Sequence, residues 1–335
     1  MKKIAVVILN WNGAKLLQQF LPVVLLYSDE ATIYVADNAS TDDSITVLKN
    51  EFPSVKIIQN KANFGFAKGY NECLQAVEED IYCLLNSDVE VTKDWLKPIL
   101  LLFEEQPNAA IIQPKILDYN HKTHFEYAGA AGGFIDKFGY PFCRGRIFNT
   151  IEEDKGQYND IQAVFWASGA CFFMRKSVFR ELNGFDADFF AHQEEIDLCW
   201  RSSQWQYETY YCGFSTVYHV GGGTLNATNP KKTYLNFRNS LFMLTKNVPT
   251  RSLAFVLVSR MILDGLAGIQ FLYQLKFSHF TAILKAHFSF YGSFLKMVKK
   301  RGKIVNKKYA FQTSIVYNYF LRNQKKFIDN FNNSL

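Results

Sequence analysis

The alternation of apolar runs with helix-like stretches in the first third of the chain constrains its fold most strongly. The runs are rich in Val, Ile and Leu, and the stretches between them space their apolar residues as helices do. The expected strands are residues 4–9, 32–36, 55–58, 81–85 and 109–113, and the expected helices are 14–26, 44–51, 67–77 and 92–105. Continuous apolar strands separated by helices are typical of a parallel sheet covered on both faces. The pattern predicts an α/β fold.

The pattern becomes less regular in the middle of the chain. Residues 116–161 are rich in Gly and aromatic side chains and are expected to form loops or short strands along a pocket wall. A strand is predicted at 163–174, followed by helices at 177–182 and 194–203.

Composition excludes several classes of protein. With 335 residues and 48% hydrophobic side chains, the chain can bury a large core. The net charge of +6 is modest, and acidic clusters offset the Lys and Arg of the first 240 residues, which disfavours nucleic-acid binding. The 6 cysteines include no CxxC pair, so buried thiols in a reducing compartment are expected. The apolar run at the start ends at Asn10, which is too short for a signal peptide.

A change in composition near residue 248 predicts two regions, 1–248 and a helical, basic and aromatic region 249–335. Residues 253–273 are strongly apolar, but Arg260 and Asp264 disfavour a membrane-spanning helix. One interpretation is an amphipathic region lying on a membrane. The other is a helical subdomain that packs on the first region or on a second subunit. The sequence does not indicate the oligomeric state.

Polar residues follow the ends of the predicted strands, where α/β sheets bind their ligands. Asp88 ends the segment Asn86-Ser87-Asp88, and a hard cation such as Mg²⁺ or Mn²⁺ could use its carboxylate together with diphosphate oxygens. The alternative is a turn or helix-capping residue. Asp37 could accept a hydrogen bond from a nucleobase, or the loop that begins with it could simply cap the next helix.

Residues 184–201 are the most informative segment. Asp197 and Arg201 are four apart and are expected to form an ion pair on one helix face. The segment gathers several carboxylates close to aromatic residues, where like charges raise each other's pKa, and a carboxylate tuned in this way can serve as a general base. The alternative is a solvated acidic helix start. His219, followed by glycines, could ligate a metal as a neutral imidazole, or could simply be hydrogen-bonded at a strand end.

Together these segments resemble the family 2 glycosyltransferases of the GT-A fold, especially the bacterial rhamnosyltransferase-like branch. The matching segments are VILNWNG (7–13), DNASTD (37–42), NFGFAKGYN (63–71), LNSDV (85–89), SGA (168–170), residues 184–201 and HVGG (219–222). The resemblance covers about residues 1–245, and it implies a mostly parallel, Rossmann-like sheet with helices on both faces.

The resemblance also implies roles for individual residues. The nucleobase would lie against Asp37 and the Asn10 loop, and the ribose and diphosphate against the loop 63–65. Asp88 and His219 would hold a divalent metal ion, Mg²⁺ or Mn²⁺. The base falls on Glu195, beside Glu194, where the family has a Glu-Asp pair. The residues expected to bind the nucleotide sugar are Asn10, Asn12, Asp37, Asn38, Asn63, Gly65, Asn71, Asn86, Ser87 and Asp88, and those expected in the acceptor or sugar pocket are Trp166, Ser168 and Gly169.

The predicted function is that of an inverting glycosyltransferase of cell-surface polysaccharide synthesis. It would move a sugar from a UDP- or dTDP-sugar to a hydroxyl of a saccharide or lipid-linked saccharide. The expected location is the cytoplasm, with peripheral contact at the inner face of the membrane. Two alternatives are a non-catalytic carbohydrate-binding protein and a nucleotidyltransferase that makes sugar nucleotides. Asn10-Trp11-Asn12-Gly13 lacks the charge that a triphosphate loop needs, which disfavours the second.

Overall fold

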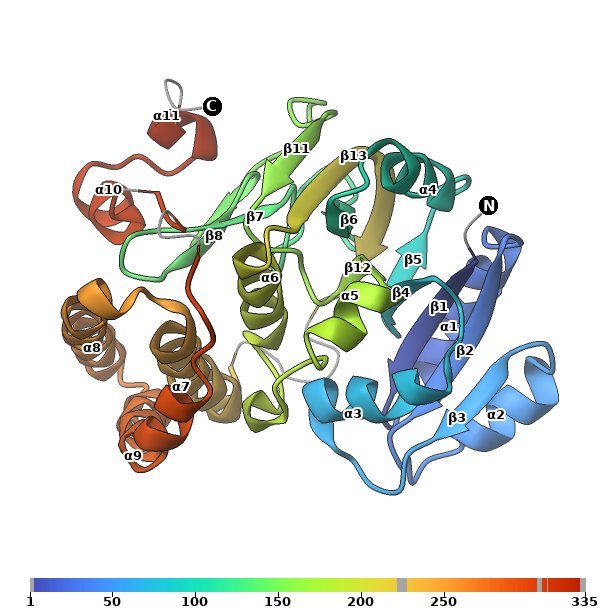
Figure 1. Ribbon diagram of the computed structural model, residues 1–335, viewed down its shortest axis with the longest axis horizontal. Coiled ribbons are helices and arrows are strands. Elements are labelled where there is room, and N and C mark those ends of the chain that lie inside the picture. Colours follow the sequence, from blue (N-terminus) through green and yellow to red (C-terminus); the bar gives the residue numbers. More distant parts are fainter. Residues whose placement is uncertain (1–2, 222–227, 306–308, 312, 332–335) are drawn as a thin grey trace.

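The computed structural model describes residues 3–221, 228–305, 309–311 and 313–331 (Figure 1). Within these residues one large sheet has the order β11-β13-β6-β12-β4-β1-β2-β3, with β5 paired to β13. Its strands are β1 (Ile4–Asn10), β2 (Ala31–Asp37), β3 (Lys56–Gln59), β4 (Ile81–Asn86), β5 (Val89–Val91), β6 (Ala109–Asp118), β11 (Ile161–Val164), β12 (Cys171–Arg175) and β13 (Glu208–His219). A second small sheet contains β7 (Gly133–Ile135), β8 (Pro141–Cys143), β9 (Arg146–Ile147) and β10 (Thr150–Ile151).

The first half of the large sheet is parallel, as predicted. Strands β4, β1, β2 and β3 run side by side in one direction. Their register places Asn10 opposite Asp37, and Leu9 opposite Asn86. The polar residues that end these strands therefore lie together at one edge of the sheet, where an α/β fold presents its ligand site.

Helices cover both faces of this sheet because successive residues of a strand point to opposite sides. Ile4, Val6 and Ile8 pack into a core with α1 (Ala14–Leu26), α2 (Ser44–Glu51) and α4 (Leu96–Glu105). Ala5 and Val7 pack into a second core on the other face. That core includes residues of α3 (Gly65–Cys73), α5 (Lys176–Glu181), α6 (Glu194–Gln204) and α7 (Pro230–Asn247). The predicted α/β class with helices on both faces is confirmed.

The second half of the sheet is mixed. Strand β12 is antiparallel to its neighbours β4 and β6, and β13 is parallel to β6 but antiparallel to β11 and β5. The strand predicted at 163–174 is wrong as a single element, because it is divided into β11 and β12. Between them Trp166 turns toward the small sheet, and its carbonyl accepts a hydrogen bond from the Gly133 N–H at 3.1 Å. The strand end expected at His219 is that of β13, but the bounds of β13 and helix α7 were not predicted.

The C-terminal region is helical, as expected. It contains α8 (Thr250–Tyr273), α9 (Phe277–Lys299), α10 (Ile315–Leu321) and α11 (Phe327–Phe331). Short 3₁₀ turns lie at Leu74–Ala76 and Ala187–Phe189. Figure 1 shows α7, α8 and α9 gathered on one side of the sheet, away from β1, β2 and β3. The predicted boundary at 248 falls between α7 and α8. All 6 cysteines are buried and free, as predicted.

Candidate active site

A hydrogen-bond network links the residues at the carboxyl ends of β1 and β2. Asn10 Nδ2 donates to Asp37 Oδ1 over 3.1 Å, and the Asp37 carboxylate also accepts from the Ser40 N–H at 2.9 Å and the Ser40 hydroxyl at 2.5 Å. Asn10 Oδ1 is buried and has no hydrogen-bond partner among the described residues. Because buried polar atoms are nearly always paired, this oxygen marks a position where a ligand could donate.

The other predicted asparagines of this edge support its loops. Asn12 Oδ1 accepts from the Thr41 N–H at 2.7 Å. Asn38 Nδ2 donates to the Gly65 carbonyl at 3.0 Å, and Asn63 Oδ1 accepts from the Gly65 N–H at 3.0 Å. Gly65 has a φ of +72°, and a Cβ there would lie 2.6 Å from the Phe190 carbonyl oxygen. Only glycine fits this close approach.

Asn71 and Ser87 occupy different positions. Asn71 Nδ2 donates to the Phe185 carbonyl at 2.7 Å and its Oδ1 accepts from the Phe185 N–H at 2.9 Å. Both ends of its amide are thus used to tie α3 to the segment before α6. Ser87 faces the turn after β1, since a Cβ on Gly13 would lie 3.8 Å from Ser87 Oγ.

Asp88 and His219 meet, although 131 positions of sequence separate them. His219 Nε2 lies 3.1 Å from Asp88 Oδ1 and 3.5 Å from Asn86 Nδ2. His219 Nδ1 lies 3.3 Å from Glu126 Oε1, and all three of Asp88, Glu126 and His219 are buried. Burial favours the neutral imidazole, but the contacts with Asp88 and Glu126 outweigh it and raise the pKa of His219 to about 10.

This donor set fits a divalent cation only in part. Among the described residues, no group of three or more His, Cys, Asp and Glu is placed to hold a metal. Asp88 can supply a carboxylate oxygen. His219 can supply an imidazole nitrogen only after a cation displaces its proton, and Glu126 would fix the ring from its other side. Both donors suit a cation such as Mn²⁺ that takes its remaining ligands from a bound diphosphate or water.

The loop before α6 has an unusual backbone. Phe190, His192 and Gln193 have φ values of 65°, 70° and 72° without being glycines. Each such residue costs about 1–3 kcal/mol unless its surroundings enforce it, and strain of this kind gathers at functional sites. Helix α6 begins directly after this loop with Glu194 and Glu195.

Four consecutive side chains of this segment carry a buried polar atom without a hydrogen-bond partner among the described residues: His192 Nε2, Gln193 Oε1, Glu194 Oε2 and Glu195 Oε2. Burial raises the pKa of Glu195 to about 7. Burial, with the neighbouring charge of Glu195, raises the pKa of Glu194 well above its usual range. Both carboxyls therefore favour the protonated form more than an exposed carboxyl does, and Glu195, with its pKa near neutral pH, is poised to exchange a proton.

The residues predicted for the acceptor pocket differ in their placement. Trp166 is buried, donates from Nε1 to the Phe134 carbonyl at 2.8 Å, and covers Gly133. Ser168 is buried too, and its N–H donates to Gln113 Oε1 at 2.7 Å. Gly169 lies at the site itself, because a Cβ there would lie 3.9 Å from Glu195 Cγ. Trp166 and Ser168 thus support the wall, and Gly169 forms part of it.

Backbone contacts join these parts into one site. The Asn86 N–H donates to the Ala170 carbonyl at 2.9 Å, which connects the Asp88 turn with the Gly169 wall beside Glu195. The Phe66 N–H donates to the Phe190 carbonyl at 2.8 Å, which connects the start of α3 with the loop before α6. The Asp88 turn, the Gly169 wall with Glu195, the start of α3 and the loop before α6 are therefore neighbours.

Sequence reasoning missed two groups of residues. Glu126 lies in a segment without regular structure, so nothing in the sequence connected it with His219. Asn239 of α7 is fully buried, and its Nδ2 donates to the carbonyls of Phe189, Ala191 and His192 at 2.9, 2.8 and 2.7 Å. Asn239 thus holds the strained loop in place. The sequence does carry a signal for the start of α7, because the N-cap residue Asn229 is followed by Pro230 at the first helical position.

Buried ion pairs hold the first turn of α6 against α7. Lys246 Nζ contacts Asp186 Oδ2 at 2.8 Å and Asp197 Oδ2 at 2.7 Å, and all three side chains are buried. Arg201 Nε contacts Asp197 Oδ2 at 2.8 Å, which confirms the predicted ion pair. Helices α6 and α7 are therefore locked together behind Glu194 and Glu195.

Comparisons with known proteins identify the family of the chain. The family model described as Glycosyl transferase family 2 matches residues 5–183. An N-acetylglucosaminyl-diphospho-decaprenol L-rhamnosyltransferase of Mycobacterium tuberculosis is 24% identical over 212 residues, covering 58% of this chain and 68% of that protein. The low-salt glycan biosynthesis hexosyltransferase Agl10 of Haloferax volcanii is 20% identical over 286 residues, covering 82% of this chain and 87% of that protein.

Solved structures share the fold. The mannosyltransferase PcManGT from Pyrobaculum calidifontis, in complex with GDP-Man and Mn²⁺, has a TM-score of 0.53 and 12% identity, covering 88% of this chain and 87% of that chain. GalNAc-T7 with UDP, GalNAc and Mn²⁺ has a TM-score of 0.58 and 15% identity, covering 73% of this chain. The chain spans about half of GalNAc-T7, 48% of its length. Both neighbours are GT-A glycosyltransferases, and the family match covers more than half of the chain, so the protein belongs to glycosyl transferase family 2.

Proposed function

We propose that this chain is an inverting glycosyltransferase in which Glu195 is the general base. The observation that carries the proposal is the Glu195 carboxyl, with a buried oxygen that has no partner among the described residues and a pKa of about 7. A base works best when its pKa lies near the working pH. Neither a carbohydrate-binding protein nor a nucleotidyltransferase would need this carboxyl, and family membership disfavours both.

The step is a single displacement. Glu195 takes the proton of an acceptor hydroxyl, and the hydroxyl oxygen forms a bond to the anomeric carbon of the donor. The bond between that carbon and the diphosphate oxygen breaks, and the nucleoside diphosphate leaves with the electron pair. Attack from the face opposite the leaving group inverts the anomeric configuration. Burial and the adjacent charge of Glu195 raise the pKa of Glu194, which disfavours a second negative charge beside the base.

Donor binding is assigned to the carboxyl edge of the parallel strands. Asn10, with its unpaired oxygen, and Asp37 would contact the nucleobase, and the start of α3 lies next to them through Asn38. Asp88 and His219 would hold a divalent cation, which when bound would neutralise the charge that develops on the leaving diphosphate. The Mn²⁺ named with two structural neighbours supports this assignment.

The proposed acceptor is a saccharide, in particular one carried on a lipid diphosphate. The name of the mycobacterial relative, which places rhamnose on such a lipid, supports this acceptor class. A lipid-linked acceptor would be met at the cytoplasmic face of a membrane, so peripheral membrane contact is part of the proposal. UDP- and dTDP-sugars are the proposed donors.

A donor screen tests the function. The purified full chain is incubated with a panel of nucleotide sugars and Mg²⁺ or Mn²⁺, and release of nucleoside diphosphate is measured. We expect metal-dependent release from one donor, lowered about 10²–10⁴-fold in Glu195→Gln. Silence across the panel with every metal, together with no thermal shift from any nucleotide, would contradict the proposal.

A further inference from the structure

Helix α8 exposes a continuous apolar stripe. Its members recur every three or four residues and are more than half exposed: Phe255, Val258, Ile262, Leu266, Ile269 and Tyr273. Tyr273, at the end of the helix, is 90% exposed. This spacing puts the six side chains on one face of the helix, which rises about 1.5 Å per residue. Single exposed apolar residues are normal, but a contiguous row of them marks an interaction surface.

Arg260 and Asp264, the two charged residues in the middle of α8, point inward. Arg260 Nε contacts Asp264 Oδ1 at 2.7 Å, and both side chains are buried. Arg260 also donates to the Gly139 carbonyl at 3.0 Å, and Asp264 Oδ2 lies 3.2 Å from His287 Nε2 of α9. The charges that disfavoured a spanning helix thus belong to the inner face. Among the described residues, α8 is long and apolar enough to cross a membrane, yet this paired inner face is held against the rest of the protein.

Helix α9 continues the apolar surface. Its exposed members are Phe277, Leu284, Phe288, Tyr291 and Leu295. Tyr291 lies at the seam between the helices, where its hydroxyl is 3.3 Å from Met261 Sδ of α8. The opposite faces of the two helices are covered, that of α8 by Gly139 and Tyr140 and that of α9 by α7. Both stripes therefore lie on exposed surface of the hairpin, and we call these eleven residues the hairpin face.

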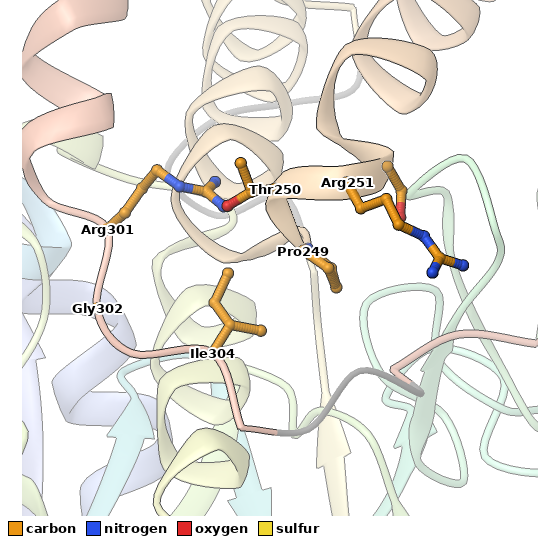
Figure 2. Close-up of a pocket in the computed structure, with 7 residues that line it drawn as sticks. Pro249, Thr250, Arg251, Arg301, Gly302 and Ile304 are labelled. Carbon is orange, nitrogen blue, oxygen red and sulfur yellow. The ribbon is translucent and has the colours of Figure 1, made fainter.

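Positive charge surrounds the hairpin face. From residue 249 to 335 the sequence has 14 Lys and Arg but 2 Asp and no Glu. Exposed Lys276 lies at the turn between α8 and α9, and exposed Lys285 and Lys299 lie on α9 itself. Arg251 lies in the first turn of α8. It lines a hollow together with Pro249, Thr250, Ser252, Arg301, Gly302 and Ile304. Figure 2 shows the Arg301 guanidinium turned toward Thr250, whereas Arg251 extends away from it.

We propose that the hairpin face docks the protein on an anionic lipid bilayer. Apolar side chains enter the boundary between headgroups and acyl chains, and the surrounding Lys and Arg contact the anionic headgroups. Exposed Tyr and Phe suit this boundary because their rings are apolar with a polarisable or polar edge. A second copy of the chain would bring two strongly basic regions together, so charge complementarity favours the bilayer over a dimer.

Docking rests on the hairpin face and not on the chemistry at Glu195, so it is tested separately from the proposed function. The full chain is mixed with vesicles of phosphatidylcholine, alone or with phosphatidylglycerol, and the bound fraction is measured by sedimentation. The test variant is Ile262→Gln/Leu266→Gln/Ile269→Gln. The matched control, Leu26→Gln/Leu101→Gln/Phe214→Gln, changes three exposed apolar residues outside the hairpin.

We expect the intact chain and the control to bind the anionic vesicles, more weakly at high salt, and the α8 variant to bind about tenfold less or worse. A second variant, Lys285→Gln/Lys299→Gln, lowers binding to anionic vesicles without removing apolar surface, and it decides the question if the first variant does not fold. Equal binding of all variants, or no sedimentation of the intact chain with either vesicle, would overturn the proposal. So would a dimer of the intact chain that the α8 variant cannot form.

Discussion

Glu195 shows how one carboxyl acquires its chemistry from its surroundings. A Glu in water has an ordinary pKa near 4.5, and burial at the start of α6 raises the pKa of Glu195 to about 7. Two of the strained residues, His192 and Gln193, lie just before Glu194, and the Glu195 side chain lies beside Gly169. The strained backbone and the buried carboxyl cost stability. In return, the carboxyl exchanges protons near neutral pH.

The pH dependence of the reaction follows from this pKa. Below the pKa the carboxyl holds a proton and cannot accept another, so kcat/KM should fall about tenfold for each pH unit below 7 and level off above it. Initial rates between pH 5 and 9, at saturating metal, measure this limb. A limb centred near 4.5 would mean that the base is an ordinary solvated carboxylate.

Asn239 is expected to act as a positioning residue. In Asn239→Asp the three donated hydrogen bonds to Phe189, Ala191 and His192 are lost, and the loop before α6 shifts. A displacement of about 1 Å at a reacting group can lower the rate about 10²-fold, so kcat should fall by that order while the KM for the donor changes little.

Two further variants separate positioning from folding. Asn239→Gln keeps the amide donors and should recover part of kcat. The control, Ser240→Ala, removes a neighbouring buried hydroxyl whose bond goes to Asn236 of the same helix, and it should keep kcat. Equal losses of donor affinity and kcat in Asn239→Asp, or a melting temperature lowered as much as the rate, would point to a purely structural role.

Part of the site could be predicted from residues alone, and the rest required the fold. Asn10, Asp37 and Asp88 follow apolar strands, and the topology of a parallel sheet brings such positions together. Glu126 and Asn239 reach the site through segments far away in sequence, and no local pattern marks such contacts. The backbone strain at Phe190, His192 and Gln193 was also invisible, because non-glycine residues rarely adopt positive φ.

At the scale of elements, hydrophobic periodicity predicted the bounds of a helix or strand best where the apolar residues of that element repeat regularly. Helix α2 spans residues 44–51 as expected, and α1 spans 14–26 despite Pro22 within it. Helix α4 begins at Leu96 rather than Thr92, because Thr92 Oγ1 donates to the Thr216 carbonyl of β13 and so belongs to a turn. The bounds of β13 were missed, although His219 was placed at a strand end, because a shift in its pairing with β6 between Cys212 and Thr216 interrupts its alternation.

The contact between α6 and α7 depends on one buried cation. In Lys246→Met, Asp186 and Asp197 lose a shared partner inside the protein, and the free energy of unfolding should fall by about 3 kcal/mol. The matched control is Lys296→Met, because Lys296 is 60% exposed in its pair with Asp188 and should cost at most about 1 kcal/mol. Urea unfolding at pH 7 compares the two. Equal losses of unfolding free energy in the two variants would mean that Lys246 contributes no more stability than an exposed lysine does.

At the scale of the whole molecule, folding unites groups that the sequence keeps apart. Asp88 directly precedes β5 and His219 ends β13, and the antiparallel pairing of β5 with β13 places His219 opposite Val89, next to Asp88. Strand β13 is held in the sheet in turn by its pairing with β6. The candidate metal site is therefore a property of the complete sheet, as is its link through Glu126 to the segment after β6. Loss of the sheet would separate these ligands.

Metal and nucleotide should stabilise this fold together. With UDP or dTDP and Mn²⁺ each at about a hundred times its dissociation constant, the gain in stability should be about 2.7 kcal/mol or more, and larger than with either alone. Thermal melting with and without EDTA measures it. Asp88→Ala should abolish the joint effect, and Asp29→Ala, an exposed carboxylate, should keep it. A joint effect that survives Asp88→Ala would place the metal elsewhere.

The most direct measurement of the central claim compares transfer and donor binding in Glu195→Gln. Gln keeps the shape of the side chain but cannot accept the proton, so sugar transfer should fall about 10²–10⁴-fold while the dissociation constant of the nucleotide sugar, measured by calorimetry, stays within about threefold. Transfer at the rate of the intact enzyme would contradict the account, because Glu195 would then not be the base. Loss of donor binding in parallel with transfer would contradict it too, because Glu195 would then belong to the donor site.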